Sequence, residues 1–282
     1  MDEERDFSDG ELERYARHLV LPEIGEAGQA KLLDSRVLVI GAGGLGSPLL
    51  LYLAAAGVGT LGVVDDDAVD LSNLQRQVIH GEAEIGAPKV ASAARRLKAI
   101  NPDVRVEEHR TRLTAANALA LVSAYDLVCD GSDNFATRYL ANDACHLAGR
   151  SLVTAAIMRF DGQLTTLRSH RGHGSDGAEN PCYRCLFGEQ PEDPKQSCAD
   201  VGVLGALAGT MGALQAVEAV KELLGIGRSL AGRLLLYDAL EAGFRTIRAK
   251  ADPDCPLCGA RPSIGSLSDL DYRPDAAVCA AE

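Results

Sequence analysis

The stretch VLVIGAGGLG, residues 37–46, decides the fold of this 282-residue chain. Its first part, VLVI, is a short run of apolar and mostly β-branched residues, which is typical of a buried strand in a parallel sheet. Gly41, Gly43 and Gly46 then give the spacing GxGxxG at a turn from strand to helix. Glycine permits a tight turn, so the free N–H groups of the helix N-terminus can face a phosphate. The motif predicts a nucleotide site without saying which nucleotide.

The residues that follow support this interpretation. A helix of small and apolar residues is expected over 47–57, and a second strand over 59–65. Asp65 lies 24 positions after Gly41. In dinucleotide-binding folds an acidic side chain at about this spacing meets a ribose hydroxyl.

Composition excludes several classes of protein. The net charge is −12, aromatic residues make up 4% and there is no Trp. The negative charge argues against a nucleic-acid partner, because phosphate neutralisation needs a basic surface. The low aromatic content argues against it too, because few side chains can stack on bases. The N-terminal MDEERDF lacks a signal-peptide core, and the most apolar run, residues 201–214, is too short to span a bilayer. We therefore expect a cytoplasmic protein without a membrane partner.

Turn signals and apolar periodicity predict the remaining elements. Ser8 and Glu11 form a capping box before an N-terminal helix, and a second short helix follows over 25–33. Further helices are expected over 88–100, 115–124, 134–148 and 203–224. Further strands are expected over 104–109, 125–130, 151–157, 162–167, 233–238 and 244–248, the third and fourth of these pairing with each other.

Polar residues gather beyond the ends of the predicted strands. Arg76 and Lys89 follow the second strand, and Asp133 follows the strand over 125–130. Ligands of open α/β sheets bind at the carboxyl ends of strands. Two cations and an acid suit triphosphate chemistry, in which the cations neutralise oxygens and the acid holds Mg²⁺. Taken singly, each residue also fits a structural role, and a lone GxGxxG favours NAD or FAD.

Four of the eight cysteines form two CxxC pairs, Cys182 with Cys185 and Cys255 with Cys258. Each pair suits a turn that directs two thiolates at one tetrahedral Zn²⁺, and a closed four-thiolate site is structural. The zinc would join the flexible region over the 170s to 190s to the C-terminal segment. A redox role, or two unrelated reduced pairs, are the alternatives.

Seven motifs together carry a resemblance to a known family. GAGGLG, DLSNLQRQ, GAPK, DGSDN, CYRC, SCADVGVLG and CPLC resemble those of the MoeB and ThiF adenylyltransferases, which activate ubiquitin-like sulfur carriers and are related to ubiquitin-activating enzymes. The resemblance runs from about Arg14 to Cys258. It implies an α/β, doubly wound Rossmann-like fold with a mostly parallel sheet, an antiparallel extension and a four-cysteine zinc site, in a homodimer. We expect an N-terminal helical arm over 1–35, an adenylation domain over 36–258 and a loosely ordered tail over 259–282.

The resemblance implies a nucleotidyltransferase that uses ATP, Mg²⁺ and Zn²⁺. The C-terminal glycine carboxylate of a carrier ending in Gly-Gly would attack the α-phosphate of MgATP, giving an acyl adenylate and pyrophosphate. The favoured carrier is the small subunit of molybdopterin synthase, in molybdenum cofactor biosynthesis. The thiamine-thiazole carrier or another sulfur-pathway carrier is the alternative, and a rhodanese or cysteine desulfurase would donate the sulfur. An NAD oxidoreductase and a catalytically idle zinc-bearing interaction module are the alternatives from other classes.

The resemblance also implies roles for matching residues. Asp65 would hold ribose hydroxyls and Asp133 would bind Mg²⁺, while Asn73, Arg76 and Lys89 would contact phosphates. The full set expected at the nucleotide is Gly41, Gly43, Gly44, Gly46, Asp65, Ser72, Asn73, Leu74, Gln75, Arg76, Lys89, Asp133 and Asn134.

Two further positions have roles only through the resemblance. Arg17 matches an arginine that reaches into the partner subunit's site, whereas the residue alone reads as a solvated surface cation. Cys198 matches a cysteine that some relatives use covalently, and a cysteine without a role is the alternative. Cys129 and Cys145 fall on a predicted strand and helix and are interpreted as packing residues.

Overall fold

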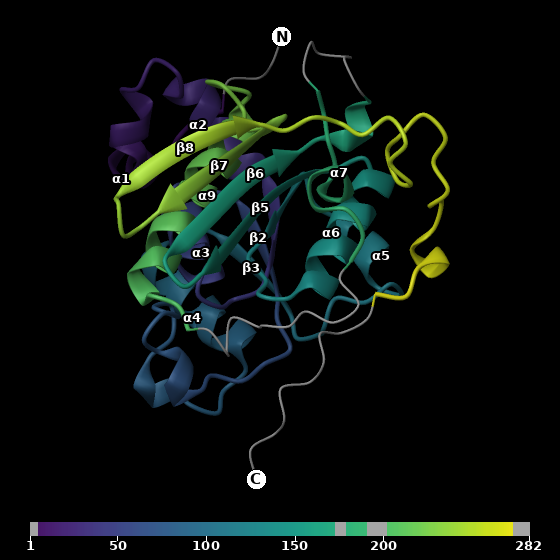
Figure 1. The fold of residues 1–282 in the computed structure, drawn as a ribbon. Coiled ribbons are helices and arrows are strands. Elements are labelled where there is room, and N and C mark those ends of the chain that lie inside the picture. Colours follow the sequence, from purple (N-terminus) through teal and green to yellow (C-terminus); the bar gives the residue numbers. More distant parts are fainter. Residues whose placement is uncertain (1–4, 173–178, 191–201, 273–282) are drawn as a thin grey trace.

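An eight-stranded sheet forms the centre of the computed structural model, which describes residues 5–172, 179–190 and 202–272. The strand order is β3-β2-β1-β4-β5-β6-β7-β8 (Figure 1). The strands from β3 to β5 in this order are parallel, and β6, β7 and β8 extend the sheet in antiparallel fashion. The bounds are β1 Arg36–Ile40, β2 Thr60–Val64, β3 Arg105–His109, β4 Leu127–Asp130, β5 Ser151–Met158, β6 Asp161–Leu167, β7 Arg233–Asp238 and β8 Gly243–Arg248.

Helices cover both faces of this sheet, so the predicted doubly wound α/β fold is confirmed (Figure 1). On one face lie α2 Gly25–Asp34, α3 Gly46–Ala55, α4 Lys89–Ile100 and α9 Gly205–Leu224. On the other lie α5 Ala118–Ser123, α6 Phe135–Leu147 and α7 Tyr183–Phe187. All five residues of β2 are buried, because a parallel strand covered on both faces is apolar throughout. None of the helices in the described ranges is long and apolar enough to cross a membrane.

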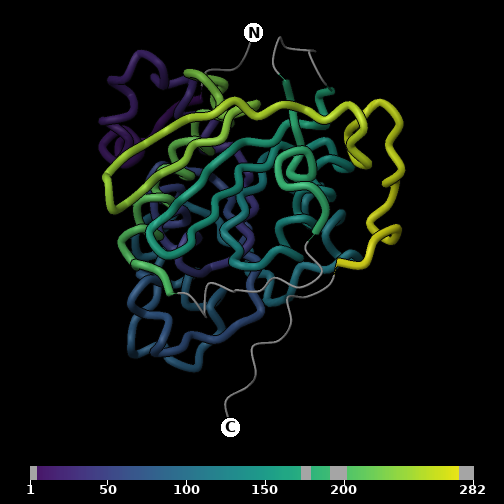
Figure 2. Tube along the Cα trace, viewed as in Figure 1, coloured from purple at the N-terminus to yellow at the C-terminus, as the bar shows by residue number. Residues whose placement is uncertain are grey.

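The N-terminal helix α1, Asp9–Leu19, packs onto the domain through Tyr15. The predicted capping box of Ser8 and Glu11 is present. A Cβ on Gly57, whose φ is +84°, would lie 2.6 Å from the Tyr15 ring. The Asn101 side chain donates to the Tyr15 hydroxyl at 2.9 Å, so α1 is held by a buried polar contact as well. The next helix, α2, lies beside α9, which begins 180 residues later in the chain (Figure 2).

The segment after residue 259, predicted as a loosely ordered tail, packs against α6 as far as Tyr272. Leu267 lies in the core on the α6 face of the sheet. The Tyr272 hydroxyl donates to Asp143 Oδ2 on α6 at 2.8 Å. The domain boundaries at residues 35 and 258 stay predictions.

Candidate active site

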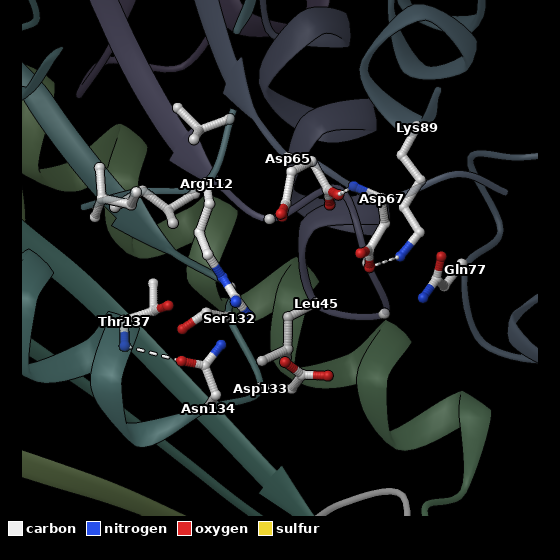
Figure 3. Close-up of a pocket in the computed structure, with 18 of the residues that line it drawn as sticks. Leu45, Asp65, Asp67, Gln77, Lys89, Arg112, Ser132, Asp133, Asn134 and Thr137 are labelled. Carbon is white, nitrogen blue, oxygen red and sulfur yellow. Dashed lines mark hydrogen bonds and ion pairs between the residues drawn. The ribbon is translucent and has the colours of Figure 1, made fainter. Parts of the chain in front are cut away.

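A pocket opens beyond the carboxyl ends of β1, β2 and β4. The chain runs from β1 to β2 on one side, and β4 pairs with β1 on the other, so this is the point where the strand order reverses. Open α/β sheets bind ligands at such a switch point. The cavity has a volume of about 200 Å³, and its walls come from the glycine-rich turn, the end of β2, α4 and the loop after β4 (Figure 3).

The glycine-rich turn is closed by contacts that only glycine permits. Gly41 has a φ of +92°, and its N–H donates to the Val64 carbonyl at 2.8 Å. A Cβ on Gly46 would lie 1.9 Å from the Gly41 carbonyl oxygen. A Cβ on Gly43 would meet nothing closer than the Gln77 side chain at 3.6 Å, although Gly43 lines the pocket. The two glycines of one motif therefore have different roles. Gly46 permits the tight turn, and Gly43 leaves space in the cavity.

Two substitutions distinguish the role in the turn from the role at the cavity. Gly46→Ala should destabilise the protein by about 1–3 kcal/mol, because an overpacked turn must shift. Gly43→Ala should leave the melting temperature nearly unchanged and weaken MgATP binding, because its methyl group occupies the cavity. Thermal melting and calorimetric titration with MgATP measure both. Equal losses of stability in the two variants would contradict this division.

Asp65, at the end of β2, fastens the turn to the neighbouring segment. Its Oδ2 accepts from the N–H of Ala42 at 2.8 Å, and its Oδ1 from the N–H of Asp67 at 2.9 Å. Burial raises the pKa of Asp65, and the charge of Lys89 and the two N–H donors oppose that rise. Each carboxylate oxygen keeps a lone pair for a further donor, which a ribose hydroxyl can supply.

The two predicted phosphate cations lie on the same wall. Lys89 is 5% exposed, and its Nζ lies 2.7 Å from Asp67 Oδ2. Arg76 lies over the turn, where a Cβ on Gly44 would be 3.5 Å from its Cγ. Asn73 accepts from an Arg76 terminal nitrogen at 2.8 Å, so its side chain orients the guanidinium.

The loop after β4 presents Asp133 at the mouth of the pocket. Asp130 is fully buried and accepts from the Ser132 N–H and the Thr154 hydroxyl, both at 2.9 Å. Burial raises the pKa of Asp130. Asn134 caps α6 by accepting from the Thr137 N–H at 2.9 Å. These bonds fix the loop on both sides of Asp133, whose own side chain is exposed.

The structure brings together most of the residues predicted at the nucleotide. Those lining the pocket are Gly41, Gly43, Gly44, Asp65, Arg76, Lys89, Asp133 and Asn134. Those that do not line it are Gly46, Ser72, Asn73, Leu74 and Gln75. Arg17 lies on the exposed surface of α1 and is also not among the lining residues. Cys198 falls outside the described residues.

Several lining residues were missed by the sequence analysis. Arg112 lies three residues beyond the end of β3, is exposed, and extends into the pocket (Figure 3). Its place beyond a strand's carboxyl end was the available signal. Gln77 Oε1 and Ser132 Oγ are buried in the pocket walls without a hydrogen-bond partner in the described part of the chain. Buried polar atoms are normally partnered, so the pocket is suited to a polar ligand such as a nucleotide.

A second cavity adjoins the first and shares Asp133, Arg138 and Ile157 with it. It lies over β5 to β8 and has a volume of about 730 Å³. Its lining is largely apolar, and the rings of Tyr237 and Phe244 stack there with centroids 4.3 Å apart. We call it the apolar groove. A polypeptide lying in it would have one end at the pocket.

The four predicted metal ligands converge at one point. Their Sγ atoms all lie within 4.8 Å of one another, with Cys182 3.5 Å from Cys255 and Cys185 3.4 Å from Cys258. Four thiolates on one Zn²⁺, at Zn–S distances of about 2.3 Å, stand about 3.8 Å apart, so the cluster fits the ion. Between the first two cysteines, Arg184 pairs with Asp143 on α6 at 2.6 Å, and Asp143 is fully buried.

Protein purified without chelators should hold about one zinc per chain. Stripping it should lower the melting temperature by several degrees, because the metal-binding free energy is linked to folding. Elemental analysis and thermal melting measure the two effects. Cys182→Ser should lose the metal, while Cys145→Ala, at a buried cysteine outside the cluster, should keep it. Metal-free protein with an unchanged melting temperature would contradict the assignment.

Comparisons with known proteins give one consistent result. The sequence matches the ThiF family over residues 15–257. A sulfur carrier protein adenylyltransferase of Thermus thermophilus is 52% identical, with 93% of this chain and 96% of that protein covered. A SAMP-activating enzyme E1 of Haloferax volcanii is 49% identical, with 95% and 96% covered. The adenylyltransferase and sulfurtransferase MOCS3 of Bos taurus is 53% identical, with 93% of this chain but 56% of that protein covered. The crystal structure of E. coli MccB with ATP shares the fold, with a TM-score of 0.73, 21% identity, and 87% and 74% coverage.

Proposed function

The chain belongs to the ThiF family as an adenylyltransferase of the MoeB and ThiF type, and from this premise we propose that it adenylylates the C-terminal glycine carboxylate of a small ubiquitin-like sulfur carrier. One observation carries the proposal. A glycine-rich turn, two cations and an exposed acid meet at a single pocket, and that pocket opens into the apolar groove.

The nucleotide is bound by three walls of the pocket. Its ribose hydroxyls donate to Asp65, and its phosphates lie at the glycine-rich turn between Arg76 and Lys89. The cavity of about 200 Å³ is smaller than the 300–1,000 Å³ usual for ligand pockets. We therefore expect exposed Arg112 to turn aside when ATP enters and to contact the nucleotide from above.

The chain's part in the reaction is positioning and charge neutralisation. An oxygen of the carrier carboxylate forms a bond to the α-phosphorus, and the bond from that phosphorus to the leaving pyrophosphate oxygen breaks. The attacking carboxylate is already ionised at neutral pH, so no general base is needed. Arg76, oriented by Asn73, and Lys89 neutralise the charge that develops on pyrophosphate. Asp133 is the residue that would hold Mg²⁺, which supplies further neutralisation when bound.

The apolar groove supports a protein substrate over a small molecule. An extended C-terminal tail can run along β5 and past Asp133 into the pocket, while the carrier's folded part covers the exposed Phe244 and Met158. The favoured carrier is the small subunit of molybdopterin synthase. The thiamine-thiazole carrier or another sulfur-pathway carrier is the alternative. A rhodanese or cysteine desulfurase then supplies the sulfur.

The proposed assembly is a cytoplasmic homodimer in which Arg17 completes the site of the partner subunit. Structural zinc at the four cysteines holds α7 to the C-terminal segment. Cys198 stays a candidate for covalent use.

An NAD oxidoreductase would not need Arg76, Lys89 and Asp133 at one pocket, and an idle interaction module would not need to retain them.

Exchange of labelled pyrophosphate into ATP tests the proposal. It should require Mg²⁺ and a carrier with its C-terminal Gly-Gly, and a carrier lacking those two residues is the matched control. The exchange rate is measured with the molybdopterin-synthase small subunit and, in parallel, with the thiamine-thiazole carrier. The carrier that gives the faster exchange indicates the pathway. Absence of exchange with every carrier, or equal exchange with the truncated one, would reject adenylylation of a carrier tail.

A further inference from the structure

A third cavity lies at the opposite ends of the strands from the nucleotide pocket. Because β6 is antiparallel to β5, the carboxyl end of β6 and the amino end of β7 lie beside the amino ends of the parallel strands. The nucleotide pocket lies at the carboxyl ends of those strands. The loop 225–232, between α9 and β7, forms one wall, and Lys31 of α2 and the end of β8 form others. Its volume is about 1150 Å³.

This cavity, which we call the basic groove, carries a charge opposite to that of the whole chain. The chain has a net charge of −12. The groove is nevertheless lined by two acids, Glu179 and Glu222, and by seven cations. The cations are Lys31, Arg168, Arg171, Lys221, Arg228, Arg233 and Arg248.

Acidic side chains nearby neutralise only part of this set. Arg168 pairs with Glu222 at 2.6 Å and Arg248 with Glu179 at 3.3 Å, while Lys221 pairs with Glu218 of its own helix. Lys31 and Arg228 are exposed and make no ion pair with any residue of the described ranges. At least two cations of the groove therefore remain for a ligand.

Arg233 adds a fixed positive charge beside Arg228. Its Nε and one terminal nitrogen donate to the carbonyls of Ser229 and Arg228, at 3.2 and 3.0 Å, which hold the guanidinium against the loop. Burial and the neighbouring Arg228 lower the pKa of Arg233. The loop therefore holds the Arg233 guanidinium beside residue 228, whose own side chain is a second cation of the groove, and an anion bound there would be attracted by both charges.

We propose that the basic groove docks an acidic peptide segment, a short run of Asp and Glu on a partner protein. Guanidinium groups match carboxylates in a bidentate fork, and five of the seven cations are arginines. The volume exceeds the 300–1,000 Å³ of typical small-molecule pockets and suits several residues of extended chain. Because the groove and the nucleotide pocket lie at opposite ends of the strands, both can be occupied at once.

The same observations disfavour a nucleic acid. No aromatic side chain lines the groove in the described part of the chain, so bases would lack a stacking surface. A long polyanion would also meet the acidic remainder of the surface, whereas a short acidic segment interacts only with the groove.

Fluorescence anisotropy with labelled octaglutamate tests the docking. Saturating MgATP is present throughout, which keeps the probe away from Arg76 and Lys89. We expect saturable binding that weakens as salt rises, with no binding of an octapeptide of Gly and Ser. An oligothymidylate of eight nucleotides is the nucleic-acid arm. If it binds more tightly than octaglutamate, the partner is not an acidic peptide and the proposal is overturned.

Charge reversal locates the binding. Lys31→Glu with Arg228→Glu should weaken octaglutamate binding by at least about tenfold. The matched control, Arg96→Glu with Arg110→Glu, changes the net charge equally at exposed positions outside the groove and should stay within about twofold. Melting temperatures verify that both variants fold. Pyrophosphate exchange should be unchanged in the groove variant, since neither Lys31 nor Arg228 lines the nucleotide pocket. Equal weakening by the two variants, or no saturable binding to the wild type, would refute the groove.

Discussion

Asp133→Ala is expected to lower carrier-dependent pyrophosphate exchange by about 10²-fold or more, the cost of removing one preorganised charge-stabilising group. The fold should survive, because the Asp133 side chain is exposed and its loop is held by the bonds of Asp130 and Asn134. The melting temperature should therefore match that of the wild type. Exchange and melting, measured on the same preparation, separate loss of chemistry from loss of structure.

Asp66→Ala is the matched control for this prediction. Asp66 is also an exposed carboxylate in the pocket wall, next to Asp65, but we assign Mg²⁺ to Asp133 and not to Asp66. We expect it to keep most of the exchange activity. Residual activity of Asp133→Ala should need higher Mg²⁺ concentrations than the wild type. Near-normal exchange by a folded Asp133→Ala enzyme would move the metal to another residue.

Mixing two inactive variants should restore activity if Arg17 acts in the partner subunit. Arg17 is exposed on α1 and does not line its own chain's pocket. Arg17→Ala and Asp133→Ala should each be nearly inactive as homodimers. In a mixed dimer one site combines an intact Asp133 with an intact Arg17 from the other chain. Random exchange makes about half of the dimers mixed, so activity should reach up to roughly a quarter of the wild type.

Arg14 provides the control on the same helix. Its side chain donates to the Ile100 carbonyl of its own chain at 3.1 Å, so Arg14→Ala should remain active and needs no complementation. Native mass spectrometry establishes that subunits have exchanged. If mixed dimers form and no activity returns, Arg17 does not act across the interface.

The sequence predicted the strands well for a simple physical reason. Parallel strands covered on both faces must be apolar throughout, so β1 and β2 stand out as continuous runs whose bounds differ from the prediction by one residue. The end of the chain was harder. Tyr272 is polar and follows a turn-rich stretch, and only the folded structure reveals the buried Asp143 that it contacts.

The candidate site was predicted in its composition more than in its geometry. The motif that carries Asn73 and Arg76 identified both residues, but the pattern could not say that Asn73 holds Arg76 instead of facing the cavity. Arg112 was missed because its meaning depends on β3 lying next to β2, a pairing of distant segments. The basic groove has no local signature at all, since its cations come from separate elements that meet only in three dimensions.

The contact of Asp143 with Arg184 and Tyr272 has a consequence for the synthesis of the chain. All of the residues predicted at the nucleotide precede residue 135, so their strands and turns can form on the ribosome before the rest emerges. The fully buried Asp143, however, receives its cationic partner 41 residues later and its tyrosine partner 129 residues later. A buried charge without a partner is strongly destabilising. We therefore expect the α6 face to close only after Arg184 has left the ribosome, and the Tyr272 hydroxyl adds a further partner near the end of synthesis.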